Sequence, residues 1–227
     1  MYQLEITPRD VNETARQYAF RILRHNILYL KLAPGQLISE VEISKQLNMS
    51  RTPIREALKD LEKSNIVNIE PQRGTFVSKI NKQLVSNACF IRLTIEHAII
   101  ALACEGISKD YINLLEENLF MGSYYVSKGE IGKWFLQDDE FHNLIFKACG
   151  KEQVYQLFGD VMIHFNRVRI MNLKEVNMTI AHNEHIVLLD AIKARDEKLA
   201  LATLDKHLTY CVEHCNVGDD IDDYNNL

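Results

Sequence analysis

Three histidines and one aspartate in the C-terminal half of the chain have the types and spacing of a metal site. Asp138 and His142 are four positions apart, so a helix places both on one face, one turn from each other. His185 and His207 lie in two apolar segments separated by a turn at 194–196, and an antiparallel helical hairpin would bring them together. Three imidazoles and one carboxylate without a thiolate favour a divalent ion, zinc first, then nickel or manganese, with coordination positions open for a ligand.

The same residues allow two other interpretations. A single histidine beside apolar residues is more often a hydrogen-bonded core residue than a ligand, and we assign this structural role to His97, His164, His182 and His214. A metal-dependent hydrolase is the alternative function, but the candidate ligands have no evident general base beside them. Glu184 adjoins His185, yet it points about 100 degrees around the helix. We therefore expect a protein that is not an enzyme.

The elements that must position these ligands are helical. From about residue 83 to residue 215 the chain has almost no proline and no clear strand alternation. Apolar periodicity predicts helices over 91–102, 111–119, 134–149, 154–171, 182–194 and 197–215. Gly150 is expected to end the third of them as a C-terminal cap. Six or so such helices form a bundle whose interior can hold a ligand or a metal.

A second group of residues, in the N-terminal third, has the chemistry of DNA recognition. Apolar periodicity predicts a helix of about 20 residues from Val11, and a short helix starting at Ser39 with Glu42 completing a capping box. A third helix is expected over 51–63, capped by Ser50. Arg51, Thr52, Arg55 and Lys59 lie on or beside its exposed side, and Pro53 fits its first turn. Two short helices joined by a tight turn predict a helix-turn-helix whose arginines read guanine or clamp phosphate.

A basic hairpin is expected to follow these helices. Strands over 66–69 and 75–78 are joined by 71–74, which includes Arg73 and Gly74. A hairpin after a helix-turn-helix makes a winged helix, and glycine at its tip would let the wing approach the DNA backbone closely. The predicted fold is thus mostly α, with a winged helix-turn-helix over 10–80, an all-helical bundle over 83–215 and an acidic tail over 216–227.

Charge is divided between the two parts. The whole chain of 227 residues carries −5, which on its face argues against a nucleic-acid partner. Residues 1–80 contain twelve basic and nine acidic side chains, a net of +3, so the remainder carries −8. This asymmetry indicates a basic binding module joined to an acidic body.

The segment Ser50-Arg51-Thr52-Pro53-Ile54-Arg55-Glu56-Ala57-Leu58, with Leu32-Ala33-Pro34-Gly35 before it and Arg73-Gly74-Thr75-Phe76-Val77 after it, resembles the DNA-binding domain of the GntR superfamily of bacterial transcriptional regulators. The resemblance implies DNA contacts at Arg51, Thr52, Arg55 and Gly74. Pro53 occupies a position where some members have a contacting hydroxyl residue. Val41 stands where some relatives carry a DNA-contacting arginine, so that contact is absent.

The C-terminal part is similar to the FCD ligand-binding domain of FadR-type regulators. The similarity is carried by Asp138-x-x-Phe141-His142, by Glu184-His185 with Leu189-x-Ala191-Ile192, and by His207-Leu208. It implies that Asp138, His142, His185 and His207 hold a divalent ion whose coordination a carboxylate effector completes. Further candidates for effector binding are Arg92, Asn166, Arg167 and Arg169, although an ion pair between Arg92 and Glu96 is an equally good interpretation.

These resemblances imply a homodimeric regulator, expected to be a repressor, that binds double-stranded operator DNA and responds to a small organic acid. A constitutive DNA-binding protein with purely structural histidines is a further alternative. The first residues lack the basic start and apolar core of a signal peptide, and no run approaches the ~20 apolar residues of a membrane span, so we expect a cytoplasmic protein. The five cysteines are expected to be small core residues, and a redox contact between Cys211 and Cys215 is the minor alternative.

Overall fold

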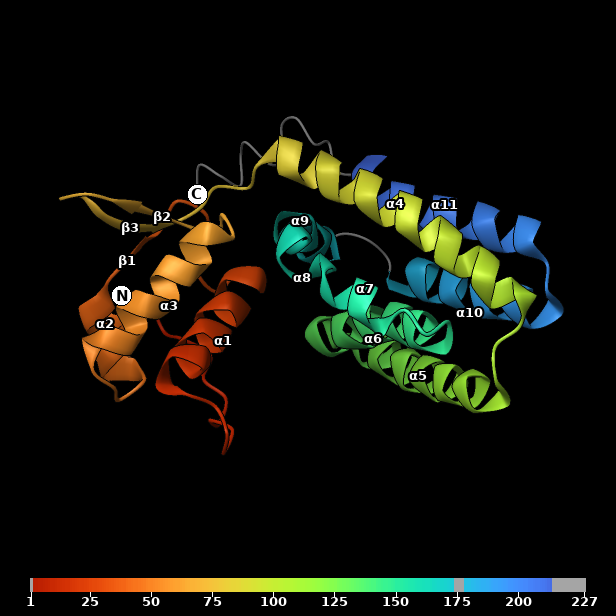
Figure 1. The fold of residues 1–227 in the computed structure, drawn as a ribbon, viewed down its shortest axis with the longest axis horizontal. Coiled ribbons are helices and arrows are strands. Elements are labelled where there is room, and N and C mark those ends of the chain that lie inside the picture. The colour runs from red at the N-terminus through yellow and green to blue at the C-terminus, as the bar shows by residue number, and fades with distance from the viewer. Residues whose placement is uncertain (1, 174–177, 214–227) are drawn as a thin grey trace.

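The computed structural model describes residues 2–173 and 178–213 (Figure 1). A small domain with three helices and a three-stranded sheet lies at one end, and a larger all-helical domain forms the rest. The two are joined where β3 leads into α4, and α8 and α9 lie on the side of the helical domain that faces α1. The expected acidic tail at 216–227, His214 and the contact between Cys211 and Cys215 lie outside the described part of the chain.

The first helix, α1 (Ala15–Leu28), is shorter than its periodicity predicts. It begins at Thr14, whose hydroxyl accepts from the backbone N–H of Gln17, while the Gln17 side chain accepts from the N–H of Thr14. This reciprocal capping starts the helix after Val11. Val11 is fully exposed, so its expected place in the core was wrong.

The predicted helix-turn-helix is present as α2 (Glu40–Gln46) and α3 (Arg51–Lys63). The predicted capping box at Ser39 is wrong, because the Ser39 side chain makes no capping hydrogen bond and its backbone N–H donates to the Tyr2 hydroxyl instead. Ser50 is the N-cap residue of α3, but its side chain also makes no capping bond.

The wing is an antiparallel sheet of β1 (Leu37–Ile38), β2 (Val67–Glu70) and β3 (Gly74–Val77), in the order β1-β3-β2. The hairpin of β2 and β3 lies close to its predicted position. Strand β1 is only two residues long, and a pattern that short has no periodicity from which it could be predicted.

Within the described residues, the helical domain contains eight helices. They are α4 (Lys82–Glu105), α5 (Lys109–Lys128), α6 (Ile131–Ala148), α7 (Glu152–Gln156), α8 (Phe158–Val161), α9 (Ile163–Leu173), α10 (Met178–Ala194) and α11 (Glu197–Glu213). Helix α6 ends as expected, since Gly150 follows it with a left-handed φ of 68°. Helix α4 is long and apolar enough to cross a membrane by length and composition, but it packs against α9, α10 and α11 inside the bundle.

The single helix predicted over 154–171 is wrong, because the chain forms α7, α8 and α9 there. The turns let α9 lie between two apolar cores. Ile163 and Ile170 belong to the core of the winged helix, together with Phe135 of α6. Phe165 and Val168 belong to the core of the bundle. A helix with apolar residues on opposite sides has no single stripe, so periodicity alone could not place it.

Candidate functional site

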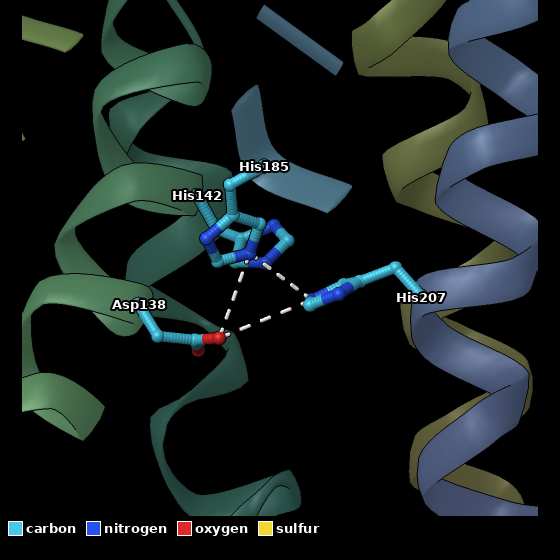
Figure 2. A group of neighbouring side chains, drawn as sticks. All are labelled: Asp138, His142, His185 and His207. Atoms are coloured by element: carbon cyan, nitrogen blue, oxygen red, sulfur yellow. Dashed lines mark hydrogen bonds and ion pairs between the residues drawn. The ribbon is translucent and has the colours of Figure 1, made fainter. Parts of the chain in front are cut away.

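The four predicted metal ligands meet at one buried point of the bundle (Figure 2). Asp138 and His142 come from adjacent turns of α6, His185 from α10 and His207 from α11. One potential ligand atom of each lies within 4.8 Å of the others. The Nε2 atoms of His185 and His207 are 3.1 Å apart, and Asp138 Oδ1 lies 3.5 Å from His185 Nε2 and 3.9 Å from His207 Nε2.

The unsatisfied atoms of this cluster fit a cation. Asp138 Oδ1 and His142 Nε2 are buried and have no hydrogen-bond partner, which is costly unless something binds them. Ligands about 2.1 Å from one tetrahedral ion lie about 3.4 Å apart, so two donor atoms 4.8 Å apart would need to close by about 1.4 Å. No thiolate is present in the cluster, and the donor set suits zinc, nickel or manganese.

Residues behind the ligands orient them. Glu96 Oε2 lies 2.7 Å from His142 Nδ1, and Glu184 Oε2 lies 3.1 Å from His207 Nδ1. With their Nδ1 atoms engaged in this way, both imidazoles turn Nε2 toward the centre, as metal-binding histidines do in known metal sites. Neither role was predicted from the sequence, because Glu96 and Glu184 each lie on a different helix from the histidine that they contact.

Electrostatics prepares the ligands for a cation. Burial acts to raise the pKa of the Asp138 carboxyl, but Arg169 and the three imidazoles outweigh it and hold that pKa well below its usual range. Burial also acts to raise the pKa of Glu96, but Arg92 and His142 bring it down to about 2. Burial lowers the pKa of His142 and of His185, so both are neutral at pH 7 and offer a lone pair.

Two nearby features complete the surroundings. The ring of Phe141 stacks on His185 with ring centroids 4.3 Å apart, which shields the centre from solvent. His182, three residues before His185, lies outside the group of four and is hydrogen-bonded to Ser123 Oγ at 2.7 Å. His97 bonds Asp205, and His164 bonds Asn65, so these three have the structural partners that we expected of them.

A cleft of about 660 Å³ adjoins the cluster, between α1 and the helical domain. Of the effector candidates, Arg92, Asn166 and Arg169 line it, whereas Arg167 is not among its lining residues. Arg92 also forms the expected buried ion pair with Glu96, with Nε and Oε1 2.5 Å apart. Arg169 donates to Asp138 Oδ2 and, at 3.3 Å, to Asn166 Oδ1. A single layer of ion pairs thus separates the cleft from the four ligands.

Helix α3 presents the predicted recognition residues. Arg51, Thr52 and Arg55 are exposed and Pro53 is half-buried, while the opposite face of α3 packs into the core of the winged helix. In the free protein, Arg55 pairs with Glu40 of α2 at 2.8 Å, and this arginine stays 59% exposed. Exposed ion pairs of this kind are weak, so Arg55 can exchange Glu40 for a phosphate or a guanine.

The glycine of the wing, Gly74, is explained by its backbone conformation. Gly74 has a φ of 126°, a conformation that residues with a Cβ rarely adopt, so the sheet itself favours glycine at this position. Arg73 is exposed beside it and pairs with Glu70. Val41, where the family resemblance implied a missing DNA contact, is 38% exposed on α2.

A winged helix with an exposed recognition helix, joined to a helical bundle with a buried polar centre, defines a two-domain DNA-binding regulator. Residues 16–77 match the family described as bacterial regulatory proteins, gntR family, and residues 88–210 match the FCD domain. The chain therefore belongs to the GntR family of transcriptional regulators, in the group that carries an FCD domain. This membership excludes the metal-dependent hydrolase that the four ligands had left open.

Relatives and solved structures agree with this family. The chain is 30% identical to the transcriptional repressor RspR of Escherichia coli K12 over 203 residues, 89% of either chain. It is 26% identical to the gluconate operon transcriptional repressor of Bacillus subtilis, covering 80% of this chain and 77% of the relative. The fold is similar to that of McbR/YncC of E. coli, with a TM-score of 0.76 at 20% identity, covering 88% of this chain and 96% of the other.

Proposed function

We propose that this regulator is a repressor whose operator binding is controlled by a small carboxylate bound at or beside a divalent metal in the FCD domain. The observation that carries the proposal is the pair of orphaned atoms, Asp138 Oδ1 and His142 Nε2, which face two further imidazoles in a buried site. Zinc is the first candidate, and nickel and manganese are the alternatives. A bound ion supplies positive charge and open coordination positions for the carboxylate.

The cleft supports an anionic effector. Arg92 and Arg169 bring positive charge to its wall, and Asn166 offers an amide. Aromatic side chains beside them, including Phe135 and Tyr155, suit the apolar part of an organic acid. Its volume of about 660 Å³ is ample for a small metabolite.

We assign the operator contacts to α3 and the wing, with Arg51, Thr52, Pro53, Arg55, Arg73 and Gly74 as the contact residues. The DNA-reading module spans 10–80 and the sensing module spans 83–215, with 216–227 as an acidic tail. Because an operator repressor works on DNA in the cell interior, we place the protein in the cytoplasm. The net charge of +3 on 1–80 suffices if its cations face the phosphates.

We infer a homodimer from exposed apolar side chains of the sensing module. Large apolar side chains are exposed on α4 and α5: Phe90, Leu102, Leu114, Phe120, Met121 and Tyr124. Burying such a surface against a second copy would remove it from water. Two winged helices would then read the two halves of a palindromic operator.

Metal analysis of the purified protein tests the metal centre. We expect about one equivalent of ion per chain in the wild type and negligible content in a variant with both His142→Ala and His207→Ala. His97→Ala is the matched control, because His97 bonds Asp205 away from the four ligands. Equal, negligible metal in all three proteins, after growth and refolding with zinc, nickel and manganese, would reject the site.

A further inference from the structure

We propose that α9 couples ion binding at the metal centre to the position of the DNA-reading module. Arg169 touches the metal ligand Asp138 at one side of this helix, and His164 and Arg167 hold the base of the wing at the other. The inference rests on the proposed function, because it takes the four-residue cluster as a metal centre. It adds the structural route by which ion binding at that centre would change DNA binding.

Arg169 is the contact with the metal centre. Its guanidinium donates to Asp138 Oδ2, while Asp138 Oδ1 faces the imidazoles of His185 and His207. The carboxylate therefore stands between the ion position and the arginine. The guanidinium also lies over the ring of Phe135, 4.7 Å from its centroid, and is almost fully buried. An ion that draws Asp138 toward the histidines would thus change the contact with Arg169.

His164 is the first contact with the DNA-reading module. Its Nδ1 accepts from the backbone N–H of Asn81 at 3.2 Å, and its Nε2 lies 3.1 Å from the carbonyl oxygen of Asn65. One neutral tautomer with its proton on Nε2 makes both hydrogen bonds. Asn65 lies in the turn between α3 and β2, and Asn81 is the N-cap of α4. One imidazole thus ties the end of the recognition helix to the start of the FCD domain.

Arg167 is the second contact. It donates from Nη1 to the carbonyl oxygen of Ser78 at 2.9 Å, immediately after β3. Together, His164 and Arg167 hold the chain just before β2 and just after β3, which are the two ends of the wing hairpin. Both side chains are buried, so these contacts are shielded from water.

The helix geometry lets α9 act as one rigid body. At about 100° per residue, Arg169 lies about 200° around the helix from Arg167, so the two reach opposite sides. Apolar residues pack α9 into both cores, with Ile163 and Ile170 on the winged-helix side and Phe165 on the bundle side. Close-packed cores transmit a displacement instead of absorbing it. A shift of α9 at Arg169 would therefore move the base of the wing.

Helix α6 is the competing route, since it carries both Asp138 and Phe135, and Phe135 packs into the core of the winged helix. The variants His164→Gln and Arg167→Met separate the two routes, because they remove the contacts of α9 and leave α6 and the four ligands unchanged. Arg24→Met is the matched control. It breaks another contact between the domains, from Arg24 Nη2 to the carbonyl oxygen of Gly159 at 2.6 Å, which does not involve α9.

The experiment measures zinc affinity by calorimetry and DNA affinity by fluorescence anisotropy, with and without zinc. The DNA is a duplex selected from random sequences by the full-length wild type. We expect zinc to change the wild-type dissociation constant for DNA at least about fivefold, the lower end of ordinary allosteric coupling. In His164→Gln and in Arg167→Met, zinc affinity stays within about twofold of wild type and the effect of zinc on DNA binding falls toward onefold. Arg24→Met keeps the wild-type response.

Two results would overturn the inference while leaving the metal centre intact. One is a wild type that binds zinc but whose DNA affinity does not respond to it. The other is a full wild-type response in both α9 variants, which would assign the coupling to α6. A wild type that binds none of zinc, nickel and manganese, or that selects no DNA, instead rejects the proposed function itself. Circular dichroism melts check that each variant is folded.

Discussion

Arg169 and Asp138 form a buried ion pair in which the arginine holds one carboxylate oxygen and leaves the other facing three histidines. The free Oδ1 atom is buried without a hydrogen-bond partner. Such an arrangement keeps the carboxylate ionised and oriented before any cation arrives. The same guanidinium lines the cleft between the domains, so it stands between the ligands and the proposed effector.

Removal of this arginine is expected to destabilise the metal-free protein strongly. Arg169→Met leaves the Asp138 charge buried and unpaired, which costs about 3–5 kcal/mol of unfolding free energy. Urea denaturation of metal-free samples measures this loss. Arg73→Met is the control, because Arg73 pairs with Glu70 on the surface and its loss should cost at most about 1 kcal/mol. Equal costs for the two variants would contradict the importance of the buried pair.

Substitution of the recognition arginine is expected to weaken DNA binding without unfolding the protein. Arg55→Ala removes a contact to base or phosphate and should cost about 1–3 kcal/mol of binding free energy. Its pair with Glu40 is exposed, so the thermal midpoint should change little. Fluorescence anisotropy at two salt concentrations measures the loss, and Lys109→Ala, on exposed α5, serves as control. Unchanged, salt-sensitive binding in Arg55→Ala would reject α3 as the recognition helix.

The stability of the protein is expected to fall in mild acid through His164. Burial, and then the charge of Arg167, lower the pKa of His164 from 6.5 to about 4. Between these values the unfolded chain binds a proton that the native protein does not, so the unfolding free energy decreases as the pH falls from about 6.5 to about 4. The contribution is about 3 kcal/mol in full and is unchanged above this window.

The variant His164→Gln tests this pH dependence. Chemical denaturation at pH 7.5 reports the cost of the lost hydrogen bonds, and a second series down to pH 4.5 reports the proton linkage. We expect a shallower dependence on pH in the variant than in the wild type, with a remaining slope from His142 and His185, whose pKa values burial also lowers. Identical slopes in the two proteins would show that His164 does not titrate in this way.

The apolar surface of α5 is expected to hold the dimer together. Phe120 is 75% exposed in the single chain, and Phe120→Glu would place a charge in an apolar interface. Light scattering after size-exclusion chromatography should show a dimer for the wild type and a monomer, or a dimer weakened at least about tenfold, for the variant. Leu157→Glu is the control, since Leu157 is equally exposed, between α7 and α8. A dimer that survives Phe120→Glu would place the interface elsewhere.

Local patterns predicted most of the elements and the four residues that meet in the buried cluster. Helical spacing puts Asp138 and His142 on one face of α6 whatever surrounds it, and the turn before α11 returns His207 toward His185. The apolar face of α3 likewise leaves Arg51 and Arg55 exposed. Interactions of this kind span a few residues, so the sequence alone determines them. The predicted start of α1 at Val11 was wrong because the capping by Thr14 was not recognised.

The tertiary structure determined the contacts between residues of different helices and the path of the chain between the two cores. Glu96 reaches His142 from α4, and Glu184 reaches His207 from α10, across helices whose packing no local pattern specifies. The three-part path of α7, α8 and α9 arises because α9 is packed by two cores at once. His164, which was predicted to be an ordinary core histidine, joins the two domains because it lies on α9, between the two cores. Contacts between segments far apart in sequence depend on the fit of whole surfaces, and that fit exists only in the folded chain.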